Sequence, residues 1–247
     1  MSHHWILLRG LSRGSAHWGG FPDLLQEQGL EIELLDLPGN GTRYNEITPI
    51  DPIEVINSIR RLSRFSKAKI TFNICAISLG GMIALKWAEL FPEEIEHIVI
   101  INSSLSQLSP ITHRISFKSL LKIIRGLTSK DSLLRESITL NLTVNNESVR
   151  DQYLLPFSQF SKEHPITTKN FFRQLYLATK IRITQTLNTP LTIVVSSQDH
   201  FVNPQCSHEM ARYFKVTPIV NSIAGHDLPL ESPQWLLKII KTISQEK

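Results

Sequence analysis

Short apolar runs alternate with amphipathic stretches along most of the 247-residue chain. The runs of strand length cover residues 5–8, 32–36, 69–75, 97–101, 191–196 and 217–222. Between them, helical patterns cover residues 21–28, 52–63, 80–90, 205–213 and 232–244. Such alternation is typical of a mostly parallel sheet whose two faces are covered by helices. The pattern therefore predicts an α/β fold with a sheet of about six strands.

This alternation stops between residues 105 and 185, where helical patterns follow one another. In one of them, apolar residues spaced three and four apart predict an amphipathic helix with a basic opposite side: Phe117, Leu120, Leu121 and Ile124 against Lys118, Lys122 and Arg125. We interpret this block as a helical cap inserted after the fourth strand. The predicted organisation is one structural domain, with a core of residues 1–104 and 186–247 and a cap of residues 105–185.

Composition narrows the class of protein. With 41% hydrophobic residues, the chain can bury a sizeable core. Its longest apolar runs fall far short of the roughly 20 residues that a membrane span needs. Residues 1–10 lack the apolar length and the small residues of a secretion signal, so we expect a cytoplasmic protein. The two cysteines, Cys75 and Cys206, have no motif spacing and predict buried thiols rather than a disulfide or a metal site.

The segment from residue 72 to residue 84 runs from an apolar strand through a serine and two glycines into a helix. This order is typical of a nucleophile elbow, in which a serine lies at the tip of a tight strand-to-helix turn. Only small residues fit two positions before and two after that serine, and Ala76 and Gly80 occupy these positions around Ser78. Alanine stands where glycine is expected. The structural alternative is an ordinary strand-turn-helix unit with a capping serine.

A nucleophilic serine needs a base to take its proton, and the base needs a carboxylate that orients it. Asp199 follows the strand predicted at residues 191–196, and His226 follows the last predicted strand. Parallel strands bring their carboxyl ends to one edge of a sheet, where ligand sites gather. The chain order Ser78, Asp199, His226 is the order expected when a serine elbow lies on such a sheet.

Each of these residues also has a plain structural interpretation. Asp199 could occupy a surface turn, and His226 could be a loop histidine with a structural role only. Asp227 is adjacent to His226 but is a poor candidate to orient it, because successive loop side chains point apart. His17 could reach the same edge of the sheet, yet a packed or solvated histidine is the simpler interpretation. Strand-end placement and chain order favour the catalytic interpretation of the first two residues.

Three further segments accompany the serine elbow. They are the turn Asp-Leu-Pro-Gly-Asn-Gly at residues 36–41, the strand and loop at residues 190–202, and the loop Ala-Gly-His-Asp-Leu-Pro at residues 224–229. In this order they resemble the α/β-hydrolase superfamily over essentially the whole chain, specifically its serine-nucleophile, carboxylesterase-like branch with a helical cap. The resemblance implies the α/β-hydrolase fold, with the chain starting at the family's third strand. It also implies Ser78 as nucleophile, His226 as base and Asp199 as the acid that orients the base.

Acyl transfer also needs two donors for the oxyanion of its intermediate. We expect the backbone N–H of Leu79, at a helix N-terminus, and that of Leu11, in the loop after the first strand, to provide them. The family usually shows His-Gly in that loop. Here Arg9 replaces the histidine, while Gly10 keeps the freedom that a tight turn needs.

The sequence thus predicts a serine hydrolase that cleaves a carboxylic ester or thioester through an acyl-enzyme on Ser78. We expect Gly10, Phe157 and Phe172 to contact this small-molecule substrate. Acyltransferases and C–C bond hydrolases use the same triad, and a non-catalytic binding protein could keep the same fold and pocket, so these alternatives stay open. The sequence has no metal-ligand spacing and no phosphate-binding glycine loop, so we expect no metal, no cofactor and no nucleic-acid partner.

Charge gives one indication about partners. The chain carries a net charge of +4, whereas residues 105–185 hold 12 lysines and arginines against 5 aspartates and glutamates. A basic cap could attract an acidic carrier protein or an anionic acyl group by electrostatic steering. The compact build with a basic cap is similar to that of carrier-protein methyl esterases. A solvated helical face and contact with a membrane surface are the alternatives.

Overall fold

A six-stranded parallel sheet runs through the middle of the computed structural model, which describes residues 3–245. The strands are β1 (His4–Leu8), β2 (Glu31–Leu35), β3 (Phe72–Ile77), β4 (Ile95–Ile101), β5 (Leu191–Ser196) and β6 (Ile219–Asn221). Their order is β2-β1-β3-β4-β5-β6, and every neighbouring pair is parallel. The predicted fold class and strand number are confirmed. Residues 1, 2, 246 and 247 of the predicted core lie outside the described residues.

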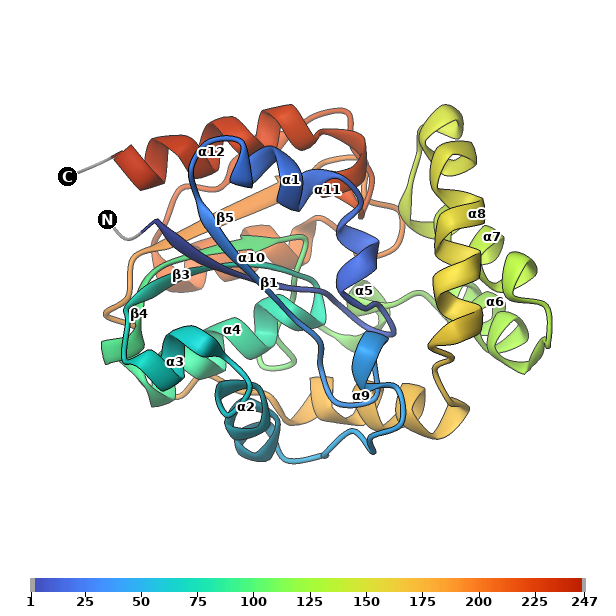
Figure 1. Cartoon of the computed structure of the whole chain (residues 1–247), viewed down its shortest axis with the longest axis horizontal. Coiled ribbons are helices and arrows are strands. Elements are labelled where there is room, and N and C mark those ends of the chain that lie inside the picture. Colours follow the sequence, from blue (N-terminus) through green and yellow to red (C-terminus); the bar gives the residue numbers. More distant parts are fainter. Residues whose placement is uncertain (1–2, 246–247) are drawn as a thin grey trace.

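Helices cover both faces of the sheet (Figure 1). They are α1 (Phe21–Gln26), α2 (Pro52–Arg60), α3 (Arg64–Ala68), α4 (Leu79–Leu90), α5 (Ile111–Arg114), α6 (Phe117–Thr128), α7 (Ser132–Thr143), α8 (Glu147–Glu163), α9 (Thr168–Lys180), α10 (Gln205–Phe214), α11 (Leu228–Glu231) and α12 (Pro233–Gln245). Short 3-10 turns are η1 (Ser15–Trp18), η2 (Gly41–Arg43) and η3 (Pro92–Glu94). Helices α2, α3, α4 and α10 pack on one face, and α1 and α12 pack on the other.

Alternation along the strands divides the core into two layers. In β1, Ile6 and Leu8 join the cluster under α4, while Trp5 and Leu7 join the cluster under α12. Successive side chains of a strand point to opposite faces, so a strand that is buried on both faces needs apolar residues at every position. Burial of each such side chain stabilises the fold by about 1.5–3 kcal/mol. This explains why the central strands are continuous apolar runs.

The largest boundary differences occur before β3. The helix predicted to reach residue 63 ends at Arg60, and a second helix, α3, follows it. The Ser63 side chain caps α3 by accepting the N–H of Ser66, and Lys69 ends α3 in a left-handed conformation with φ 55°. Residue 69 therefore cannot start the strand, and β3 begins at Phe72. A short capped helix of this kind has too few turns to show a clear apolar period.

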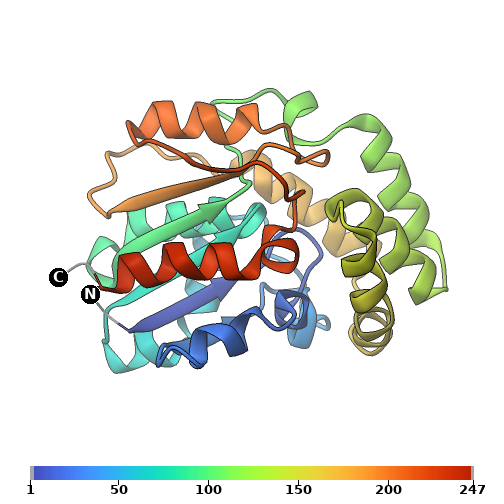
Figure 2. The ribbon, with the colours of Figure 1, turned by 90° about the horizontal axis from the view of Figure 1, so that it is seen from above.

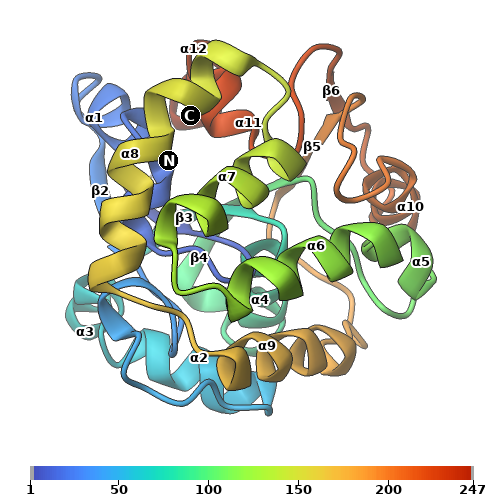
Figure 3. The ribbon, with the colours of Figure 1, turned by 90° about the vertical axis from the view of Figure 1, so that its right-hand side faces the viewer.

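Helices α5–α9 join β4 to β5 and lie over the carboxyl-terminal edge of the sheet (Figure 2). Seen from that side, α6, α7 and α8 cross in front of the strands (Figure 3). Helix α9 is tied to the core, because the Gln174 amide accepts the N–H of Ser12 at 2.9 Å and donates to the Asn40 side chain at 2.7 Å. The exact cap boundaries at residues 105 and 185 stay a prediction.

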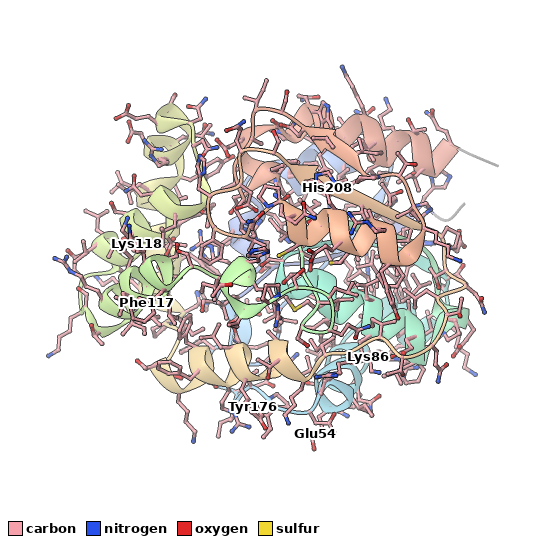
Figure 4. All side chains as sticks on the ribbon, turned by 180° about the vertical axis from the view of Figure 1, so that it is seen from behind. Glu54, Lys86, Phe117, Lys118, Tyr176 and His208 are labelled. Carbon is pink, nitrogen blue, oxygen red and sulfur yellow. The ribbon has the colours of Figure 1, made fainter. Side chains whose placement is uncertain are left out.

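The prediction that α6 is an amphipathic helix with one apolar side packed against the protein is only partly correct. Phe117 is 73% exposed and Leu121 is 51% exposed, whereas Ser119 and Gly126 are buried. Figure 4 shows Phe117 and its neighbour Lys118 on the outer side of the helical segment. The apolar residues of α6 form a stripe too wide for its contact with the neighbouring helices, so part of the stripe faces solvent. Within residues 3–245, no helix has both the length and the apolar character needed to cross a membrane.

We predict that Gly80→Ala destabilises the protein although alanine is the better helix former. A Cβ at residue 80 would lie 2.5 Å from the carbonyl oxygen of Leu8 and 2.6 Å from that of Arg9, both backbone atoms that cannot move aside cheaply. We expect a loss of about 1–3 kcal/mol in the free energy of unfolding, measured by urea denaturation. Gly20→Ala is the matched control, since a Cβ there meets no atom within 4 Å. Equal stability of the two variants would contradict the prediction.

Candidate active site

Ser78 lies at the turn between β3 and α4 in a strained backbone conformation, with φ 55° and ψ −122°. Positive φ is costly for a residue that has a Cβ, so the surrounding structure must hold it. The Ser78 N–H donates to the Ile101 carbonyl at 2.9 Å, and the Ser103 hydroxyl donates to the Ser78 carbonyl at 2.6 Å. Both anchors come from β4 and its following loop. The turn is therefore fixed on its neighbouring strand, and the geometry is that of a nucleophile elbow.

The loop after β1 approaches this serine closely. A Cβ at Gly10 would lie 2.9 Å from the Ser78 Cβ and 3.5 Å from its Oγ, so the absence of a side chain at residue 10 permits the contact. Leu11 follows directly and lines the same cavity as Ser78. Leu79 is the first residue of α4 and is buried. The two residues expected to supply oxyanion donors thus flank Ser78 from two different loops.

Asp199 and His226 form a buried hydrogen-bonded pair. Asp199 Oδ2 lies 2.7 Å from His226 Nδ1, and the two residues are 6% and 5% exposed. The other carboxylate oxygen of Asp199 accepts the N–H groups of Phe201 at 2.8 Å and Val202 at 2.9 Å. The carboxylate is therefore held by its own loop, and Asp199 is not a surface turn residue.

The backbone of the histidine loop has an anchor on β4. The Asn102 side chain donates to the His226 carbonyl at 2.8 Å and to the Ser196 hydroxyl at 2.9 Å. Asn102 follows the last residue of β4, so it links the loop after β6 to the end of β5. Sequence reasoning missed Asn102, and only its strand-end position could have indicated it.

A cavity that is partly open to solvent lies between this edge of the sheet and the helices above it. Ser78, Gly10, Leu11 and His226 all line it, so the structure brings these predicted site residues together around one space. The aromatic residues that line the cavity are Phe160, Phe171 and Phe201, and not the expected Phe157 and Phe172. Phe157 is buried and stacks edge-on against His17, and Phe172 is 47% exposed.

An ion pair that the sequence does not reveal joins the two loops beside the serine. Arg9 Nη1 and Nη2 donate to the two carboxylate oxygens of Asp227 at 2.9 and 2.6 Å, and the partners are 218 positions apart in the sequence. Their side chains are 4% and 3% exposed. The Arg9 guanidinium also lies 5.1 Å from the centre of the Trp18 ring. Asp227 thus orients Arg9 and not His226, and the pair fastens the histidine loop to the loop after β1.

A second buried ion pair lies further along the cavity wall. Arg13 Nη1 donates to Glu136 Oε2 at 2.6 Å, and the Ser161 hydroxyl donates to Glu136 Oε1 at 2.5 Å. His17 lies nearby, with Nε2 4.0 Å from Glu136 Oε1. Burial, together with the positive charges of Arg13 and Arg9, holds the pKa of His17 well below its usual value, so His17 is neutral. His17 is packed, as the simpler interpretation had it, and it also lines the cavity.

Metal ligation has no candidate in the described chain: no group of three or more His, Cys, Asp or Glu side chains among residues 3–245 could hold an ion. Both cysteines are free and buried. The polar residues that line the cavity include Ser78, His226 and members of both ion pairs.

The fold and this arrangement define an α/β hydrolase. The model of the alpha/beta hydrolase fold family matches residues 5–233, and the chain belongs to this family.

Solved structures share the fold at low sequence identity. An esterase from Exiguobacterium antarcticum is similar with a TM-score of 0.78 and 13% identity, covering 97% of this chain and 91% of that one. A lipase-like protein from Acinetobacter baumannii is similar with a TM-score of 0.76 and 21% identity, covering 100% and 86% of the two chains.

Among curated proteins, the pimeloyl-[acyl-carrier protein] methyl ester esterase of Nitrosomonas europaea is 27% identical over 100 residues. That match covers 40% of this chain and 36% of the relative's length, so it spans about a third of the relative.

We predict that Asp227→Asn strongly destabilises the protein, because it leaves the Arg9 guanidinium buried without a charged partner. Breaking a buried ion pair in this way costs about 3–5 kcal/mol of the free energy of unfolding, which urea denaturation measures. Glu46→Gln is the matched control: it breaks the Arg43–Glu46 pair, whose carboxylate side chain is 49% exposed, and such surface pairs contribute about 0–1 kcal/mol. A small and equal loss in both variants would show that the Arg9–Asp227 pair does not hold the loops together.

Proposed function

We propose that this protein is a serine hydrolase that cleaves a carboxylic ester or thioester. One observation carries the proposal: His226, which is hydrogen-bonded to the buried Asp199, lines one cavity together with a serine in an elbow conformation. Membership of the alpha/beta hydrolase fold family supports it, and so do the esterases among the similar proteins.

In the proposed mechanism, Ser78 Oγ attacks the carbonyl carbon while His226 Nε2 takes the hydroxyl proton. Asp199 accepts a hydrogen bond from the Nδ1–H of His226, which fixes the tautomer and offsets the positive charge that develops on the ring. The backbone N–H groups of Leu79 and Leu11 stabilise the oxyanion. His226 then protonates the leaving alcohol or thiol. Water, activated by the same imidazole, releases the acyl group from Ser78.

Two groups of alternatives use the same fold. An acyltransferase or a C–C bond hydrolase would have the same triad and differ only in what accepts the acyl group or in which bond breaks. A binding protein without catalysis would keep the cavity but would have no need for the oriented Asp199–His226 pair or for the strained serine. That pair, whose formation buries two ionisable groups, favours an enzyme.

We expect a fluorophosphonate probe to label the protein at Ser78. Labelling should disappear in Ser78→Ala and in His226→Ala, because the first removes the nucleophile and the second removes its base. Ser197→Ala and His200→Ala are the matched controls, since both side chains are exposed and close to the acid loop. Failure of the wild-type protein to react would favour a binding protein.

Asp199→Asn should lower kcat for p-nitrophenyl esters by roughly 10⁴-fold, because the amide no longer holds the imidazole in its productive tautomer. The measurement is the steady-state rate, with circular dichroism to show that the variant is folded. Undiminished hydrolysis would mean that Asp199 is not the catalytic acid partner.

We also propose that the basic surface of the helical insertion attracts an acidic carrier protein that presents the acyl group. Residues 105–185 carry seven more positive than negative charges, and Lys118, Lys122 and Arg125 are exposed on α6. Lys118 is labelled in Figure 4. The name of the curated relative from Nitrosomonas europaea describes a substrate that is linked to an acyl-carrier protein, which supports such a partner for this protein.

Rising salt should therefore lower kcat/KM for a carrier-linked acyl ester but leave that for a small neutral ester unchanged. Lys118→Glu combined with Lys122→Glu should have the same selective effect. Equal responses of the two substrates would exclude steering by this surface.

A further inference from the structure

Buried polar atoms without a partner gather around the candidate active site. Within residues 3–245, the buried side-chain atoms that have no hydrogen-bond partner include Ser12 Oγ, Arg13 Nη2, His17 Nε2 and Arg135 Nε. All four residues line the cavity that holds Ser78. Leaving a buried polar group unpaired costs about 1–3 kcal/mol, and more for a charged group, so native proteins rarely tolerate several in one place. A ligand that accepts hydrogen bonds would satisfy them.

Arg13 is the centre of this group. It is 8% exposed, and its Nη1 donates to Glu136, while its Nη2 has no partner among the described residues. Glu136 in turn has both oxygens engaged, one by Arg13 and one by the Ser161 hydroxyl. Glu136 therefore orients the guanidinium by one edge and leaves the other nitrogen free to donate to a ligand.

Charge in the cavity wall favours an anion over a neutral acceptor. Arg9 is balanced by Asp227 and Arg13 by Glu136, whereas Arg135 has no carboxylate within ion-pair distance in the described part of the chain. One positive charge is thus left without a counter-ion at a half-buried position that lines the cavity. A neutral acceptor would fill the hydrogen bonds but would leave this charge uncompensated. A carboxylate would both accept these hydrogen bonds and compensate the positive charge of Arg135.

The loop that carries Ser12 and Arg13 is anchored beside the serine. Gly10 touches Ser78, and Arg13 follows three residues later in the same loop. The Asn40 side chain donates to the Arg13 carbonyl at 3.1 Å and to the Gly10 carbonyl at 3.4 Å, which fixes the loop between them. Apolar side chains complete the wall: Ile123, Leu127, Ile138, Leu142 and Ile166. The cavity thus combines an apolar lining with one charged end, which suits an alkyl chain that ends in an anion.

We propose that Arg13, assisted by Arg135 and Ser12, binds a carboxylate at the end of the substrate remote from the ester that Ser78 attacks. The substrate class is the half-ester of a straight-chain dicarboxylic acid. The inference deepens the proposed serine esterase activity and rests on it. The chain between the two carbonyl groups lies along the apolar wall, and the terminal carboxylate accepts from Arg13 Nη2.

Binding is tested first without catalysis, so that this proposal can fail separately from the esterase proposal. Calorimetry on the Ser78→Ala protein compares three ethyl esters with the same six-carbon acyl chain: monoethyl adipate, with a terminal carboxylate, diethyl adipate, with a neutral end, and ethyl hexanoate, with an apolar end. We expect the monoethyl ester to bind at least about 10-fold more tightly than either other ester, since a hydrogen bond to a charged group contributes about 1.5–3 kcal/mol. The wild-type protein should show the same order in kcat/KM.

Two variants identify the donors. Arg13→Lys keeps a cation for Glu136 and removes the free nitrogen, and Arg135→Met removes the unbalanced charge without touching the Arg13–Glu136 pair. Each should reduce the preference for the monoethyl ester by about 10-fold or more. Arg212→Met is the matched control, because this exposed arginine of α10 lies outside both the cavity wall and the helical insertion, and it should keep the full preference. Glu136→Gln should strengthen binding of the monoethyl ester, because it removes a negative charge beside the site while an amide oxygen remains for Arg13.

Equal binding of the three esters to the Ser78→Ala protein would overturn the carboxylate subsite, whatever the esterase assay shows. A preference that survives in both Arg13→Lys and Arg135→Met would also overturn it. Selective binding of the monoethyl ester with no turnover by the wild-type protein would instead support the subsite and contradict the esterase activity.

Discussion

The close contact between the chain segments that leave β1 and β3 is the constraint on which the rest of the site depends. These strands are neighbours at the point where the strand order reverses, so the loops after them diverge and open a crevice. Gly10 lies against Ser78, and Gly80 lies against the carbonyls of Leu8 and Arg9. Because neither glycine has a side chain, the two backbones can approach each other closely beside Ser78. A methyl group at either position would push them apart and displace the serine from its position in the cavity wall.

The parallel arrangement of the strands then explains why residues far apart in sequence meet here. Ser78, Asn102, Asp199 and His226 follow the ends of four different strands, and every strand ends at the same edge of the sheet. Each loop is short enough that its polar residue stays close to that edge. The helices α6, α7 and α8 cover the edge from above and turn an open crevice into a walled cavity. The loops at the ends of the strands carry Ser78, Asp199 and His226, and the helical insertion forms the rest of the cavity wall.

The sheet could be predicted from the sequence, because buried parallel strands are apolar at every position and differ clearly from amphipathic helices. The positions of Ser78, Asp199 and His226 could, because a strand end followed by a polar residue has a defined place in such a fold. The two ion pairs could not be predicted from the sequence. Arg9 and Asp227 are 218 positions apart, and Arg13 and Glu136 are 123 positions apart, so no local pattern encodes either contact. The outward position of Phe117 could not be predicted either, since an apolar stripe does not say how much of it the neighbouring helices cover.

The unpredicted ion pairs also bear on the proposed chemistry. In the proposed mechanism His226 becomes positively charged when it takes the proton of Ser78, and an unpaired arginine on the adjoining loop would oppose that change. Asp227 removes this obstacle, since both Arg9 nitrogens that face it are engaged by its carboxylate. Glu136 balances Arg13 in the same way, so the charge in the cavity wall that is not balanced belongs to Arg135 on the helical insertion. In the proposed substrate complex, the chain thus separates two requirements that would conflict at one place: an electrically balanced neighbourhood for the base, and a positive one for the far end of the substrate.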